Sequence, residues 1–235
     1  MNFDIIHLWR FEIGGFEIWI TETHVTTWII MGALIALAIA VRIALKNFKD
    51  VPGGFQNFIE LIVETFDSFL KTNADPKLMF LGNWYFTVFA FLLLGNICGV
   101  FFLRPPSSDW AVCFAFAIVT FVLIHVMGVR YRGAGYLKSF FEPYMAKGKI
   151  PNLLLFPLNI IGELARPVSL SFRMFGNILS GTILLGLLYG IAPVFIRVLF
   201  PVPLHMYFDL FSGILQAFIF TVLSLAFISA AAETE

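Results

Sequence analysis

The sequence predicts an all-α polytopic membrane protein with five membrane-crossing helices and one amphipathic helix at the membrane interface. Of its 235 residues, 60% are hydrophobic and only 13% are charged, whereas a soluble domain carries roughly 25% charged residues. Several apolar segments also reach the roughly 20 residues that a helix needs to cross a hydrocarbon core of about 30 Å. The 15 basic residues are scattered and the net charge is zero, so we expect no nucleic-acid partner.

We expect the whole chain, residues 1–235, to form a single membrane domain. The expected elements are a first span at 25–46, an interfacial amphipathic helix at 52–72, a helical hairpin at 79–103 and 110–130, and two long helices at 150–192 and 204–232.

The segment 52–72 differs from the others in its pattern. Apolar residues repeat at helical spacing on one face, and acidic, amide and basic side chains fill the opposite face. That face carries too much charge to span, so we expect the helix to lie in the cytoplasmic interface. A membrane-surface anchor and a docking ledge for a partner protein both remain open.

The segment 150–192 is long for a single crossing. A continuous helix of some 40 residues extends about 60 Å at 1.5 Å per residue. Either it breaks at Pro157, Gly162 or Pro167, or it crosses at a steep tilt, outside the usual range of about 0–40°. The last segment is also overlong, so we expect the two to run antiparallel as a steeply tilted pair.

Basic residues predict the orientation, because cytoplasmic loops collect lysine and arginine. With five spans, three arginines fall on one side: Arg10, Arg104 and Arg197. The larger group falls on the other side: Arg42, Lys46, Lys49, Lys71, Lys77, Arg130, Arg132, Lys138, Lys147 and Lys149. We therefore expect the N-terminus outside and the C-terminus in the cytoplasm.

Two arginines, Arg166 and Arg173, lie seven residues apart in an apolar stretch, and so on one helical face. A guanidinium stays protonated at physiological pH, and placing it at bilayer depth costs about 3 kcal/mol on insertion scales. A permanent cation there is a candidate functional residue. Two plainer interpretations remain open: Glu163 and Arg166 could form an ordinary surface ion pair, and Arg173 could extend its side chain to the interface.

Polar residues lie on both sides of Arg173 along the same segment. Glu163 is expected toward the cytoplasm, about 15 Å of helix rise away. Asn177, Ser180 and Thr182 are expected toward the outside.

The last segment adds Asp209 near the outside and Gln216 near the middle. The pattern predicts two polar pockets, one open to each face, with an arginine between them. This arrangement suits stepwise ion transfer better than a continuous pore, because a fixed cation repels other cations yet favours the ionised form of a carboxylate beside it. That carboxylate must come from a partner, since the stripe of Arg173 has no acid close to it.

Two motifs, Arg-Pro-Val-Ser-Leu-Ser-Phe-Arg-Met-Phe-Gly-Asn at 166–177 and Leu-Gln-Ala-Phe-Ile-Phe at 215–220, closely resemble the signature of subunit a of F-type ATP synthases. The resemblance extends to Pro52–Asn57, Pro106–Asp109 and Gly133–Tyr136, and covers about residues 25–232. It implies a stator subunit that holds two offset half-channels against a rotating ring of c subunits.

The resemblance also implies roles for individual residues. Arg173 would be the essential stator arginine that meets each rotor carboxylate, and Gln216 its partner on the last helix. Asn177 would line the outer half-channel, and Glu163 and Arg166 the cytoplasmic one.

The chain departs from the family pattern at three positions. It has Thr182 where many members have glutamate and some have histidine, and Gly99 where some have an aspartate in the second span. The position of Asp209 is often histidine or another acid. We therefore expect Asp209 alone to supply the outer carboxylate, while His205 and His24, at span ends, receive no role.

The implied partners are the c-subunit rotor ring, the b-subunit peripheral stalk, other ATP synthase subunits and membrane lipid. The implied location is the bacterial cytoplasmic membrane. We expect no cofactor, no metal and no nucleotide site, because the phosphate-binding Gly-rich Lys-Ser/Thr motif does not occur. The coupling ion is expected to be a proton, with sodium open, and a self-contained transporter or channel is the alternative.

Overall fold

The structure is a computed structural model that describes residues 7–13, 16–46, 48, 52–101, 103–136 and 152–233. The helices long and apolar enough to cross a membrane are Glu22–Ala44, Pro76–Phe101, Trp110–Arg132, Phe156–Ile191 and Pro201–Ala232. The predicted all-α polytopic fold is thereby confirmed. Residues 150 and 151 of the expected fourth span, and Lys49, Lys138, Lys147 and Lys149, lie outside the described residues.

A two-stranded hairpin precedes the first span, and the sequence analysis missed it. β1 (His7–Ile13) pairs antiparallel with β2 (Phe16–Thr21), and Arg10 lies opposite Trp19. The signal was nevertheless present, because two runs that alternate apolar and polar residues flank Gly14-Gly15 in the sequence.

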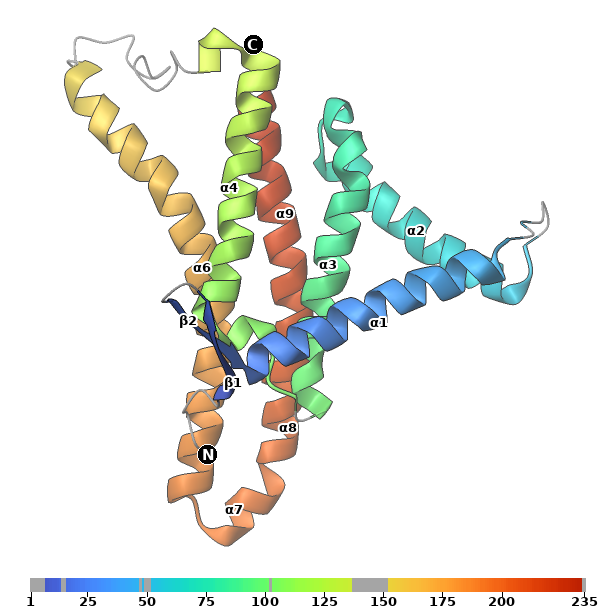
Figure 1. Cartoon of the computed structure of the whole chain (residues 1–235), viewed down its shortest axis with the longest axis vertical. Helices are drawn as coiled ribbons and strands as arrows, with labels where there is room; N and C mark the ends of the chain where they lie inside the picture. Colours follow the sequence, from blue (N-terminus) through green and yellow to red (C-terminus); the bar gives the residue numbers. More distant parts are fainter. Residues whose placement is uncertain are drawn as a thin grey trace.

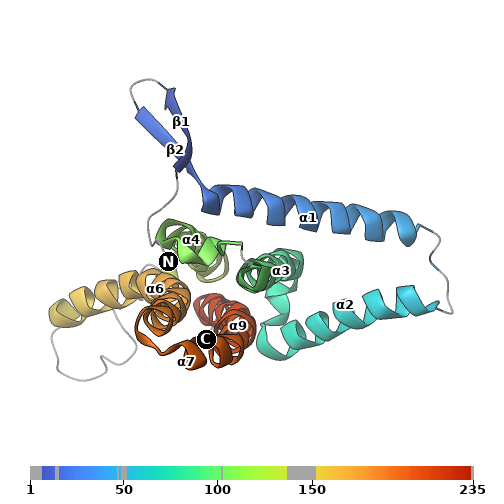
Figure 2. The same cartoon turned by 90° about the horizontal axis from the view of Figure 1, so that it is seen from below.

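The first span, α1 (Glu22–Ala44), packs on the rest of the molecule only near its start, where Thr23, Thr26 and Ile30 are its buried residues. Figures 1 and 2 show α1 running crosswise to the helices α3, α4 and α9 described below. These helices and α1 therefore do not share one tilt in a membrane. At 23 residues, α1 is about 34 Å long, which suits an upright crossing.

The helix α2 (Gly54–Asn73) follows and has two unlike faces. Its apolar face contacts the bundle near the end of the helix, where Phe66 and Leu70 are buried, while Phe55 and Phe58, near its start on the same face, are exposed. Whether α2 serves as an anchor or as a docking ledge stays a prediction.

A central bundle is formed by α3 (Gly82–Ile97), α4 (Trp110–Arg132) and α9 (Ser212–Ala232). Its core combines large apolar side chains such as Ile124 and Ile228 with small hydroxyl residues on α9. Three short 3-10 helices connect the bundle: η1 (Pro76–Leu81), η2 (Cys98–Phe101) and η3 (Pro106–Ser108).

The long segment is one continuous helix, α6 (Asn152–Ile191), of 40 residues with Pro157 and Pro167 inside it. The helix does not break at either proline or at Gly162. A broken helix, the first of the two alternatives, is therefore excluded. A proline inside a helix removes one hydrogen bond and crowds the preceding turn, so it bends the helix without ending it. Figure 1 shows such a bend, with the N-terminal part of α6 leaning away from the bundle.

After α6 the chain turns back through α7 (Val194–Leu199), α8 (Pro201–His205) and the π-helix η4 (Met206–Phe211) into α9. Consequently α6 and α9 run antiparallel (Figure 1). We call the end of the bundle formed by α7 and α8 the α7 end. The C-terminal end of α3 reaches the same end, since η2 contacts η4.

Candidate functional site

The candidate site lies along the face of α6 that adjoins η4 and α9, with Arg173 in the middle. Leu170 and Met174 are buried on the bundle side of α6, at 3% and 1% exposure. Arg173 lies at the edge of this buried face and is exposed. Among the described residues, none forms a hydrogen bond or ion pair with its guanidinium. The structure therefore presents a fixed cation to whatever lies beside this face.

Toward the N-terminal part of α6, Glu163 and Arg166 form an ion pair. Arg166 Nη1 lies 2.8 Å from Glu163 Oε2, and the arginine side chain is 34% exposed while the glutamate is 18% exposed. The Arg166 guanidinium also lies over the Phe227 ring of α9, 5.2 Å from its centre. The pair is thus fixed against α9 and is not a freely solvated surface contact. About 15 Å of helix rise separates Glu163 from Arg173.

Toward the α7 end, Asn177 joins α6 to the start of α9. Its Oδ1 accepts a hydrogen bond of 2.6 Å from the Ser212 hydroxyl. Its buried Nδ2 has no hydrogen-bond partner among the described residues. A buried donor without a partner is costly, so this amide can bind a water molecule or a group that enters the site.

Ser180 and Thr182 are already engaged within their own helix. The Ser180 hydroxyl donates to the Asn177 carbonyl and the Thr182 hydroxyl to the Ile178 carbonyl, each at 2.9 Å. Their hydroxyls remain able to accept hydrogen bonds. In the described part of the chain, neither hydroxyl forms a hydrogen bond to Asp209, the acid of this region.

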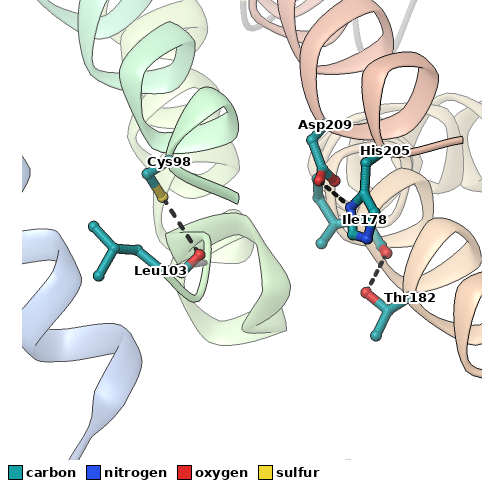
Figure 3. Close-up of polar contacts among 6 residues, drawn as sticks. All are labelled: Cys98, Leu103, Ile178, Thr182, His205 and Asp209. Atoms are coloured by element: carbon teal, nitrogen blue, oxygen red, sulfur yellow. Dashed lines mark hydrogen bonds and ion pairs between the residues drawn. The ribbon is translucent and has the colours of Figure 1, made fainter. Parts of the chain in front are cut away.

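That acid, Asp209, lies on η4 and pairs with a residue that the sequence analysis set aside. His205 Nδ1 is 2.7 Å from Asp209 Oδ2, one helical turn away. Figure 3 shows the imidazole and the carboxylate pointing toward each other, with Thr182 of α6 nearby. The spacing of four residues between a histidine and an aspartate in a helical segment was the available signal.

The other side of Asp209 packs against η2, which follows the end of α3. A Cβ placed on Gly99 would lie 3.3 Å from Asp209 Cγ and 3.4 Å from a Pro105 ring carbon. The glycine therefore leaves the room that the carboxylate fills. That Asp209 supplies the outer carboxylate stays a prediction, but the carboxylate is not isolated, because His205 accompanies it.

Two close approaches hold η4 and α9 in place. A Cβ on Gly181 of α6 would lie 2.9 Å from Phe208 Cγ, so only glycine fits there. Asn96 of α3 is 1% exposed, donates from Nδ2 to the Gly213 carbonyl at 3.1 Å and accepts from the Ser107 hydroxyl at 2.6 Å.

The expected contact between Arg173 and Gln216 is not made by a hydrogen bond. Gln216 lies on α9 and is 6% exposed, and in the described part of the chain no hydrogen bond joins its amide to Arg173. The structure thus brings Glu163 together with Arg166, and Asn177 with the start of α9, but leaves the central arginine unpaired.

No set of three or more histidine, cysteine, aspartate and glutamate side chains is placed to hold a metal ion in the described ranges. Cys98 and Cys113 are buried free thiols, as their apolar sequence surroundings indicate. The polar side chains of the candidate site can therefore transfer charge from one to another.

Comparison with known proteins gives a family match across this whole arrangement. The family described as "ATP synthase A chain" matches residues 24–229. These residues include all five candidate spans apart from their outermost residues, and every side chain of the candidate site.

Individual relatives agree with the family match. "ATP synthase subunit a 2" of Bradyrhizobium sp. is 38% identical over 94% of this chain and 92% of its own length. "ATP synthase subunit a, sodium ion specific" of Propionigenium modestum is 36% identical over 92% of this chain and 75% of its own. A chloroplast subunit a from Oedogonium cardiacum is 30% identical over 97% of this chain and 88% of its own.

Proposed function

The chain belongs to the ATP synthase subunit a family, and from this premise we propose that it forms two offset half-channels that load and unload the carboxylates of a rotating c-ring. Members of the family are part of the ion-translocating F0 sector, and this subunit has no nucleotide-hydrolysing site of its own.

The observation that carries the proposal is the unpaired Arg173 between two separate polar clusters. On one side lies the Glu163 and Arg166 pair, and on the other lie Asn177 and Asp209 near the α7 end. A guanidinium at this point repels any cation that would pass directly from one cluster to the other. It also attracts the ionised carboxylate of a rotor subunit, because Arg173 is exposed and has no hydrogen-bond or ion-pair partner among the described residues.

Each cluster then serves one half-channel. Glu163 and Arg166 belong to the cytoplasmic half-channel, where a rotor carboxylate releases its ion. Asp209 and Asn177 belong to the outer one, with Gln216 buried near the start of α9. Thr182 and Ser180 contribute hydroxyl oxygens to the outer wall.

The same proposal covers partners and orientation. The c-ring would pass along the exposed flank of α6, and a b-subunit stalk would hold the complex still. The protein would lie in a bacterial cytoplasmic membrane with its N-terminus outside, so that the α7 end is also outside. Its neighbours would otherwise be lipid and the remaining synthase subunits.

The test is ATP-driven ion pumping in membrane vesicles that carry the whole complex. Arg173→Ala is expected to abolish coupled pumping, and Asp209→Ala to slow it severely. Arg42→Ala, which removes an exposed arginine in the last turn of α1, is the matched control and should pump normally. Pumping that survives Arg173→Ala would return the self-contained transporter as the better interpretation.

A further inference from the structure

The histidine beside Asp209 has a geometry that the half-channel assignment does not use. His205 is 33% exposed and Asp209 is 17% exposed, with Nδ1 and Oδ2 2.7 Å apart. The imidazole therefore lies between the carboxylate and the more open surroundings of the α7 end. A group that reaches Asp209 from that side meets His205 first.

Neighbouring elements do not compete for the pair. The segment formed by α8 and η4 contacts α3, η2, α6, α7 and α9. The titratable or charged residues that these elements carry in this half of the molecule are Cys98, Arg173, Tyr189 and Arg197, with Tyr207 on η4 itself. None of them forms a hydrogen bond or ion pair with His205 or Asp209 among the described residues, and the Cys98 thiol donates to the Gly95 carbonyl instead.

We propose that His205 carries protons between the outer water and Asp209, so that the ion admitted at the α7 end is H⁺ and not Na⁺. This inference rests on the proposed function, because it needs Asp209 to be the acid of the outer half-channel. It adds a residue to the path and names the coupling ion.

The transfer balances with the groups present. The neutral imidazole, with hydrogen on Nδ1, donates to the Asp209 carboxylate and takes a proton from water at Nε2. The imidazolium then passes its Nδ1 proton to Oδ2, which leaves a neutral carboxyl group and a neutral imidazole with hydrogen on Nε2. The carboxyl group gives its proton inward. The imidazole then loses its Nε2 proton to water and gains one from water at Nδ1, which restores the first state with no net change in the protons on the ring. Histidine suits this task because it gains and loses a proton readily near neutral pH.

The same pair is a poor site for sodium. A hard cation needs several oxygen ligands, whereas here one carboxylate oxygen is already engaged by an imidazole nitrogen. The hydroxyl of Thr182, which Figure 3 draws near the pair, donates to the Ile178 carbonyl. An imidazolium would also repel the ion.

The experiment uses the whole complex in sealed proteoliposomes driven by ATP. Lumen acidification is followed with a pH-sensitive dye in sodium-free buffer, and uptake of radioactive sodium is followed in parallel. We expect the wild type to acidify the lumen without sodium and to take up no sodium. We expect His205→Ala and His205→Gln to slow acidification at least about tenfold, since a positioned proton-transfer group contributes roughly 100-fold or more and water replaces it in part.

Added imidazole separates proton transfer from a purely structural role. It should restore part of the rate in His205→Ala but not in Asp209→Ala, while the control His24→Ala should resemble the wild type throughout. Loss of pumping in both His205 variants without rescue by imidazole overturns the proton-carrying role. Pumping by His205→Ala at the wild-type rate, or ATP-driven sodium uptake, overturns it as well.

Arg173→Ala in the same assay distinguishes the two proposals. If it abolishes pumping while His205→Ala pumps normally, only the histidine relay fails. If pumping survives without Arg173, the proposed function itself fails.

Discussion

Asn177 on α6 and Ser212 at the start of α9 share a hydrogen bond of 2.6 Å across 35 residues of sequence. This bond holds α6 against the start of α9 one helical turn beyond Arg173. It therefore relates the fixed arginine to the helix that carries Gln216.

Removing this hydrogen bond should weaken the packing of α6 against α9. Ser212→Ala leaves the Asn177 oxygen without its donor, at a cost of about 1–3 kcal/mol, and should lower both the pumping rate and the temperature at which the subunit leaves the complex. Ser171→Ala is the control, because that buried hydroxyl donates within its own helix to the Val168 carbonyl. Equal behaviour of the two variants would show that the bond between the helices has no special role.

The contact of Gly181 with Phe208 predicts a strict size limit on α6. Gly181→Ala places a methyl group 2.9 Å from Phe208 Cγ, and relieving such overpacking costs about 1–3 kcal/mol. We expect η4 to shift, and pumping to fall with it. Gly190→Ala on the same helix has open space around its new Cβ and should be neutral or slightly stabilising. Thermal unfolding of the purified complex and vesicle pumping measure both effects.

Much of the site could be predicted from the sequence because charge in an apolar segment is costly wherever the segment lies. Arg173, Glu163 and Arg166 stand out on this ground alone. The spacing of Glu163 and Arg166 on a helix also predicts that these two residues pair. The span count follows from segment length.

Other features depend on contacts between distant segments. The continuity of α6 through Pro157 and Pro167 runs against local preference, which alone would favour a break. The extra residue in the turn of the π-helix η4 is likewise invisible in the pattern, and it changes which way Asp209 faces relative to α9. The role of His205 becomes clear only once its distance to Asp209 is known.

Gly99 should be as important for pumping as Asp209, the acid that packs against it. Gly99→Ala brings a methyl group 3.3 Å from Asp209 Cγ and 3.4 Å from the Pro105 ring, so the carboxylate has to shift by a few tenths of an ångström in its contact with His205. We expect pumping to slow while assembly is retained, because the displaced group is a side chain and not backbone. Gly32→Ala on α1, with nothing within 4 Å of the added Cβ, is the control. A normal pumping rate in Gly99→Ala would show that the position of Asp209 is not constrained from this side.

Asn96 should be the most sensitive buried polar residue outside the ion path. Its amide joins α3, the turn before α4 and α9, through bonds to the Ser107 hydroxyl and the Gly213 carbonyl. Asn96→Leu removes both bonds and leaves two polar groups without partners, at about 1–3 kcal/mol each. Ser107→Ala removes only one bond and should cost less. We expect Asn96→Leu to reduce incorporation of the subunit into the complex more than Ser107→Ala does. Asn73→Leu is the control, because Asn73 is exposed and its amide bonds within α2. If Asn96→Leu assembles and pumps like Asn73→Leu, the fixed start of α9 must depend on Asn177 and Gly181 alone.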